Sequence, residues 1–233
     1  LSSVQEPENP TERRRLPRVN MASAQLRLAN NGKLYPLTDL SLSGFGLRVT
    51  EPDDLILFAL GSRIEGVLNL HGQKVPVRGR VQHLGRASAG LEFSDLEPAT
   101  QKAIERFLDP RTLAADLKRM PAMEEKLAWW SGLGGTELWV WHPQEAGHFE
   151  RALLLLWGGY VEWTTDDGKP VAAGRWTSSA SQEPEVRGVM RFETLVLEPG
   201  QGVVEKTQKS VAKTFLLSSN LPKPLVKRLT ANL

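Results

Sequence analysis

The chain has 233 residues, a formal net charge of +2 and no cysteine. Its hydrophobic content of 40% is enough for one large or two ordinary domains with buried cores. The small net charge argues against nonspecific nucleic-acid binding, and the lack of cysteine excludes a disulfide framework, a thiolate metal site and a cysteine nucleophile. The longest apolar stretch, residues 152–161, is about half as long as a membrane-spanning helix needs to be. We therefore expect a cytoplasmic protein with no direct membrane insertion.

The chain opens with a polar segment and a cluster of arginines. Residues 1–12 are polar and contain two prolines, which predicts a disordered lead-in. A cluster of arginines follows, and it includes Arg13, Arg14 and Arg18. Pro17 lacks a backbone donor and biases its predecessor away from helix, so we expect an extended or turn-like arginine segment.

Short stretches of alternating hydrophobicity come next, with turn signals between them. The sequence Asn31-Gly32 is a strong hairpin signal between the first two stretches. Strands of this length and spacing are typical of a small barrel or sandwich. The predicted strands are residues 23–29, 33–38, 45–49, 63–70, 75–84 and 89–93.

The period then changes to that of a helix. Helices are predicted over residues 98–108, 112–120 and 122–130, and the glycine-rich segment 131–135 is the predicted domain boundary. A basic amphipathic helix is expected within 221–233. Strands are predicted at 138–141, 151–157, 160–165, 171–176, 186–197 and 202–207.

Two polar motifs in the first half have the chemistry of a nucleotide site. Arg14 and Arg18 form Arg-x-x-x-Arg, and arginine donates paired hydrogen bonds to phosphate or to the O6/N7 edge of guanine. Asp39, Ser41 and Gly44 form Asp-x-Ser-x-x-Gly. An ionised carboxylate accepts from guanine N–H donors, the serine adds a hydroxyl, and glycine permits close approach of the backbone.

The order and separation of these motifs, within a β-rich segment that closes with a strand and a helix, resemble the ligand-binding signature of the PilZ domain. This resemblance covers about residues 13–108. It implies a six-stranded barrel that binds cyclic di-GMP on its outside, with phosphate and guanine edges held by Arg14 and Arg18. It also implies a floor made of Asp39, Ser41 and Gly44, with Arg13 as a variable neighbour.

Other candidate sites have weaker support. His142 and His148 do not have the spacing of a tight metal site, and Asp166-Asp167 precedes a glycine as in a turn. Residues 131–135 lack the lysine of a phosphate loop. We therefore predict no enzyme, no catalytic residue, no metal site and no cofactor beyond the ligand cyclic di-GMP.

All seven tryptophans lie in the second half of the chain. Core packing in a β domain is the first interpretation of this cluster. The alternative is a surface for a protein or a carbohydrate, with Trp129 or Trp130 at the edge of the predicted linker helix. The tryptophans are Trp129, Trp130, Trp139, Trp141, Trp157, Trp163 and Trp176.

The sequence thus predicts a mainly β protein with a lead-in (1–12), a PilZ-like barrel (13–109), a helical linker (110–135) and a β-rich domain of unknown type (136–233). We expect a cyclic di-GMP receptor that changes conformation and relays the signal to an unidentified protein partner, and no nucleic-acid partner. One alternative is a ligand-independent interaction module with a degenerate PilZ domain. Another is the cytoplasmic regulatory part of a membrane-bound machine.

Overall fold

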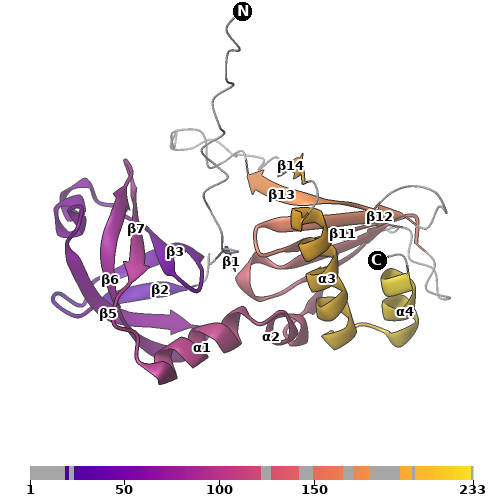
Figure 1. Cartoon of the computed structure of the whole chain (residues 1–233), viewed down its shortest axis with the longest axis horizontal. Helices are drawn as coiled ribbons and strands as arrows, with labels where there is room; N and C mark the ends of the chain where they lie inside the picture. Colours follow the sequence, from indigo (N-terminus) through magenta and orange to yellow (C-terminus); the bar gives the residue numbers. More distant parts are fainter. Residues whose placement is uncertain are drawn as a thin grey trace, which may run out of the picture.

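The structure is a computed structural model, and it describes residues 19–20, 24–121, 127–141, 149–164, 171–178, 195–200, 203–231 and 233. Its two halves are a closed antiparallel β-barrel and a separate antiparallel sheet with helices on one face (Figure 1). The predicted fold class, mainly β with an N-terminal six-stranded barrel followed by a helix and a second β-rich part, is confirmed. Among the described residues, no helix is both long and apolar enough to cross a membrane.

The barrel closes because the two strands at the ends of the six-stranded order pair with each other. Around the ring the order is β3-β2-β5-β6-β7-β4, and β4 pairs back onto β3. A short strand β1 (Val19–Asn20) extends the pairing along β3. The ring strands are β2 (Gln25–Leu28), β3 (Leu34–Leu40), β4 (Gly44–Arg48), β5 (Arg63–Leu70), β6 (Gln73–Leu84) and β7 (Ser88–Phe93).

Alternating side chains fill the barrel from inside. Along β5 and β6 every second residue is buried, as expected for strands with one face toward a core. The 3₁₀ helix η2 (Pro52–Phe58) contributes the fully buried Phe58, whose ring meets Tyr35 edge-on at 5.1 Å between centroids. Helix α1 (Pro98–Leu108) places Ile104 and Phe107 in the same core.

An ion pair fixes η2 to the start of β3. Lys33 Nζ lies 2.7 Å from Asp54 Oδ1, and the Tyr35 hydroxyl donates to Asp54 Oδ2 over 2.8 Å. The hydrogen bond from Lys33, followed by that from Tyr35, lowers the pKa of the Asp54 carboxyl. Asp54 therefore supports the folded state above its ordinary pKa, and this support is lost as pH falls through the lowered value.

The second sheet is a meander of seven strands in chain order. Helices α2 (Pro110–Ala115), α3 (Val203–Ser218) and α4 (Lys223–Ala231) cover one of its faces (Figure 1). A 3₁₀ turn, η3 (Leu133–Gly135), joins the second and third strands. The strands are β8 (Lys118–Met120), β9 (Leu127–Ser131), β10 (Glu137–Trp141), β11 (Arg151–Leu156), β12 (Gly159–Thr164), β13 (Ala172–Ser178) and β14 (Leu195–Pro199).

Three predicted elements are wrong. Residues 118–120 and 127–131 are strands of the second sheet, where helices were expected, and helix α3 begins at Val203 in place of a strand over 202–207. The run Leu127–Trp130 contains only apolar residues, and in so short a run the spacing of apolar residues does not distinguish a strand from a helix. The glycine-rich segment connects β9 to β10 inside one sheet, so the predicted helical linker over 110–135 is helical only in α2 and the one-turn η3 among its described residues.

The tryptophans divide between the two faces of this sheet. Trp130 and Trp163 are buried beneath the helices at 7% and 1% exposure, as the core interpretation predicts. Trp129 lies opposite Trp139 in the neighbouring strand, and Trp139 packs with Trp141 on the face away from the helices. Trp129 and Trp130 therefore belong to strand β9 and not to a linker helix.

Trp157 joins the two halves of the molecule. It occupies the β11–β12 turn with Gly158, and both residues have positive φ, 57° and 67°. Its indole N–H donates to the Leu108 carbonyl at the end of α1 over 3.1 Å, and its ring packs against both hydrophobic cores. Leu133 of η3 likewise packs against both cores.

Candidate functional site

The Asp39–Gly44 motif forms a tight turn between β3 and β4. The Ser41 backbone N–H donates to the Gly44 carbonyl over 2.8 Å, and the Ser41 hydroxyl donates to the same oxygen over 3.1 Å. The Ser41 hydroxyl also accepts from the Gly44 N–H over 3.2 Å. Ser41 is only 2% exposed, so its side chain fixes the turn that presents the rest of the motif. Its predicted contact with ligand stays a prediction.

Gly44 is required by the close approach of a neighbouring strand. A Cβ at this position would overlap the carbonyl oxygen of Leu91 on β7. On the same turn, the Phe93 N–H donates to the Ser43 carbonyl over 2.8 Å. The close backbone approach predicted for Gly44 is therefore an approach to β7, and it holds the turn against the barrel.

Asp39 lies on the outer surface beside a strip without side chains. Across adjacent strands, Asp39 pairs with Gly46, Gly46 with Gly90, and Gly90 with His83. Laterally paired residues point to the same side of a sheet, and the residues between them face the core. A Cβ at Gly46 would overlap the Asp39 carboxylate, which therefore lies across β4. We call Gly46 and Gly90 the glycine strip.

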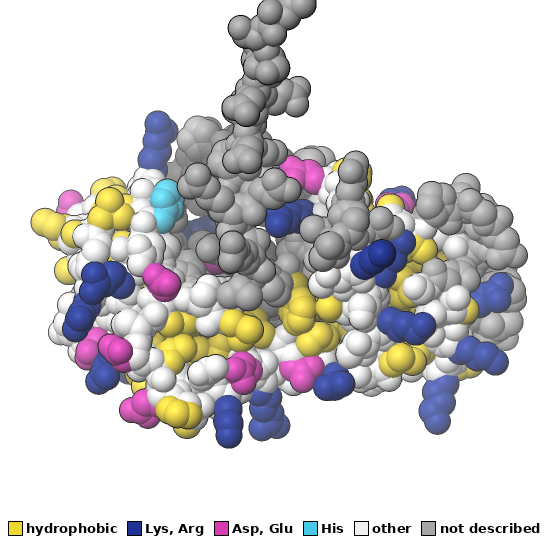
Figure 2. Space-filling view, viewed as in Figure 1, with side chains coloured by type: hydrophobic (Ala, Val, Ile, Leu, Met, Phe, Trp, Pro, Cys, Tyr) yellow, Lys and Arg dark blue, Asp and Glu magenta, His cyan; other side chains and the backbone are white. Residues whose placement is uncertain are grey.

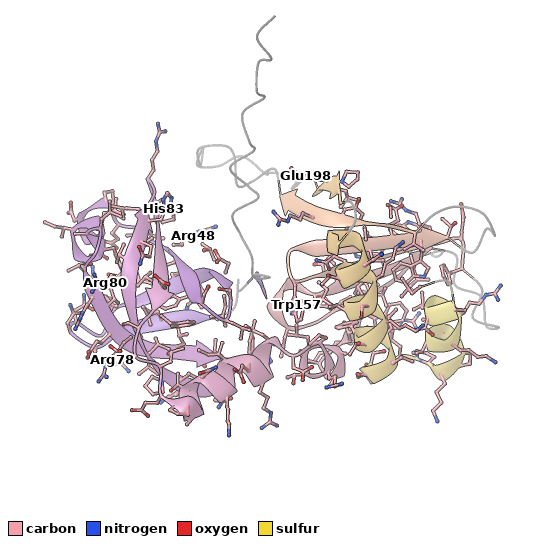
Figure 3. The ribbon with its side chains drawn as sticks, viewed as in Figure 1. Arg48, Arg78, Arg80, His83, Trp157 and Glu198 are labelled. Carbon is pink, nitrogen blue, oxygen red and sulfur yellow. The ribbon has the colours of Figure 1, made fainter. Side chains whose placement is uncertain are left out.

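Basic side chains border the glycine strip. His83 is exposed at its far end, and Arg48 is exposed two residues along β4, opposite Ser88 (Figure 3). On the other side Glu92 is paired with Arg80 across β6 and β7. A bulge between Val81 and His83 lets Gln82 also face outward, where its amide donates to Glu92 over 2.7 Å.

Sequence reasoning missed Arg48, His83 and the glycine strip. A signal was available, because an isolated glycine within a strand pattern often marks close approach by a ligand or another backbone. Gly46 stands between Phe45 and Leu47 in such a pattern. His83 lies beside the strip only because the strands pair in a particular register. No local sequence pattern reveals that register.

Strand β1, which follows the arginine segment in sequence, lies beside this surface. Arg13, Arg14 and Arg18 lie outside the described residues, but Val19 directly follows Arg18 and pairs with Leu40 of β3. Asn20 pairs with Asp39 in the same register. Strand β1 therefore holds Val19 and Asn20 next to the Asp39–Gly44 turn, and the contribution of Arg13, Arg14 and Arg18 to this surface stays a prediction.

The weaker candidate sites receive no support from the described part of the chain. His142, His148 and Asp166-Asp167 lie outside it. Within the described ranges, no group of three or more histidine, cysteine, aspartate or glutamate side chains could hold a metal ion.

Comparison with known proteins assigns the barrel to a family. The family model of the PilZ domain matches residues 12–109, and this part of the chain is a PilZ domain. PilZ domains form a family of cyclic di-GMP receptors, and they are binding domains rather than catalytic ones.

A solved structure, the PilZ domain of CeSA from a cellulose-synthesizing bacterium, is 14% identical with a TM-score of 0.31. That match covers 38% of this chain and 91% of that chain. No curated protein matches the chain.

The contact at Gly44 predicts that Gly44→Ala destabilises the barrel. The new methyl group would meet the Leu91 backbone, which cannot move without disturbing β7, so we expect a loss of about 1–3 kcal/mol in the free energy of unfolding. Denaturant unfolding followed by circular dichroism measures it.

Gly90→Ala is the matched control, because the nearest atom to its Cβ would be the His83 Cβ at 3.4 Å. Its stability should stay the same or rise slightly, since glycine in a strand is entropically unfavourable. Equal destabilisation of both variants would contradict the role given to Gly44.

Proposed function

We propose that the protein is a receptor for cyclic di-GMP. The observation that carries this proposal is the pairing of Val19 with Leu40, which anchors the chain after Arg18 beside Asp39 within a PilZ domain. The receptor works in the cytoplasm, and a chain without cysteine fits that compartment.

Each half of the site matches one part of the dinucleotide. The guanidinium groups of Arg14 and Arg18 bind phosphate oxygens and the O6/N7 edge of guanine, with Arg13 close by in sequence. The Asp39 carboxylate accepts hydrogen bonds from guanine N1–H and the exocyclic amine. Ser41 and Gly44 form the turn that holds this carboxylate in place.

The glycine strip gives a planar base room to lie against the barrel. The Asp39 carboxylate and the Thr38 hydroxyl occupy the space above Gly46, whereas the nearest atom to a Cβ at Gly90 would be the His83 Cβ at 3.4 Å, so a purine can approach the backbone at Gly90, between Asp39 and His83. The His83 ring can then stack on the base, and Arg48 adds positive charge for a phosphate.

Titration of the full chain with cyclic di-GMP by calorimetry tests the proposal. Arg14→Ala combined with Arg18→Ala should weaken binding by on the order of 100-fold or more, because each lost charge-assisted hydrogen bond contributes about 1.5–3 kcal/mol. Asp39→Ala should also weaken it. Arg106→Ala, an exposed arginine on α1, is the control. Absence of binding by the unaltered chain, or unchanged binding by the double variant, would exclude this function.

A second titration tests the border of the glycine strip. Arg48→Ala should weaken binding by roughly 10-fold or more, since a charged donor is lost, and His83→Ala should weaken it less. Arg63→Ala, exposed on β5 and two strands away from β7, should bind as the unaltered chain does. If both Arg48→Ala and His83→Ala bind normally, the ligand does not extend along the strip.

The proposal includes a relay from the barrel to the second sheet and on to a protein partner. Ligand binding to the arginine segment acts on β1, which contacts η3 of the second sheet. Leu133 of η3 packs against both cores, so movement there changes how the halves meet. An order change in a ligand-binding segment is a common origin of such switches.

Hydrogen exchange with and without cyclic di-GMP tests the relay. Protection should change in η3 and in the adjoining ends of β9 and β10, beyond the barrel itself. In Trp157→Phe, which keeps an aromatic ring but loses the bond to Leu108, the change in the second sheet should shrink while affinity stays close to normal. Protection that changes only in the barrel would show that no signal crosses.

A further inference from the structure

The C-terminal helices carry a net positive charge, whereas the rest of the chain is net negative. Residues 203–233 contain six lysines or arginines and one acidic residue, leaving 23 basic and 26 acidic residues elsewhere. The whole chain has a formal net charge of only +2, so this asymmetry is hidden in the total. A protein with such a dipole is oriented by any charged surface that it meets.

The charge lies on the outward side of α3 and α4. These helices bury Phe215, Leu216, Leu225 and Leu229 against the sheet. Lys206 and Lys213 are exposed on α3 and Lys223 and Lys227 on α4, on the opposite side from that core. We call these four residues the lysine face. Dark blue side chains project from this half of the molecule in Figure 2.

One apolar side chain lies in line with the lysine face. Leu217 follows Lys206, Ser210 and Lys213 at spacings of four, three and four residues, which places all of them on one side of α3. Its side chain is 62% exposed. The outer side of α3 therefore combines ammonium groups with an exposed leucine near its C-terminal end.

We propose that the lysine face binds an anionic membrane surface without spanning the bilayer. Clusters of four or more basic residues beside a membrane are attracted by anionic headgroups, and Leu217 can enter the headgroup region once they are neutralised. This inference is independent of the cyclic di-GMP proposal.

The chemistry of the face favours a membrane over the other anionic partners. Protein interfaces are enriched in aromatic residues and arginine and depleted in lysine, whereas every exposed basic residue of α3 and α4 is a lysine. Nucleic-acid surfaces use arginine for paired contacts to guanine and aromatic rings for base stacking. Flexible ammonium groups without directional requirements suit the diffuse charge of lipid headgroups.

Co-sedimentation of the full chain with vesicles tests the proposal. Binding is expected with phosphatidylcholine vesicles that contain phosphatidylglycerol, and not with phosphatidylcholine alone, and it should weaken as salt is raised. Lys213→Glu combined with Lys227→Glu should lower the partition coefficient by on the order of 25-fold or more, since each lysine contributes about fivefold. The control, Lys74→Glu with Lys102→Glu, makes the same charge change at exposed positions of the barrel half.

A fluorescent probe provides a second readout that does not depend on charge reversal. The chain has no cysteine, so Leu217→Cys gives a single site for an environment-sensitive dye. Its emission should shift to the blue and brighten only with vesicles containing phosphatidylglycerol, while a dye at Lys74→Cys should not respond.

Three results would overturn the proposal: no binding to anionic vesicles, equal losses in the two charge-reversal variants, or a silent dye at position 217 despite sedimentation. Binding to duplex DNA but not to vesicles would instead assign the face to nucleic acid.

Discussion

The barrel and its candidate site depend on one close backbone contact. Strand β4 can close the ring only by lying against β7 on one side and β3 on the other, and at Gly44 the Leu91 carbonyl leaves no room for a side chain. The same turn is held from within by Ser41, whose hydroxyl both donates to and accepts from Gly44. A motif that chemistry assigns to ligand binding therefore also closes the barrel, so ligand recognition and the stability of the barrel share residues.

Only the part of the site whose residues are close together in the chain could be predicted from the sequence. Asp39, Ser41 and Gly44 are adjacent in the chain, so their motif appears in a local pattern. The outer surface formed by Asp39, Gly46, Gly90 and His83 appears only when four strands are placed in register. The barrel strands alternate clearly because one face is buried, and their positions were predicted closely for the same reason.

The second half was harder to predict because its strands are apolar on both faces. Helices cover one side of the sheet, and Leu153, Leu155 and Tyr160 are buried on the other. Alternation then disappears, and Leu127–Trp130 was interpreted as part of a helix. Helix α3 begins with the β-branched pair Val203 and Val204, which favours a strand locally, but packing of Phe215 and Leu216 against the sheet determines the outcome.

The turn at Trp157 combines backbone strain in one hairpin with packing between the two halves. Its φ of 57° belongs to a turn in which glycine or asparagine would be relaxed, and a bulky residue there costs about 1–3 kcal/mol. A glycine would relieve the backbone strain of the hairpin, but it would remove the ring that packs against both cores and the hydrogen bond to Leu108. Truncation of a packed aromatic side chain costs about 3–5 kcal/mol, so the packing of this ring between the two cores outweighs the strain, and a loop residue in an unfavourable conformation is retained by contacts made outside its own hairpin.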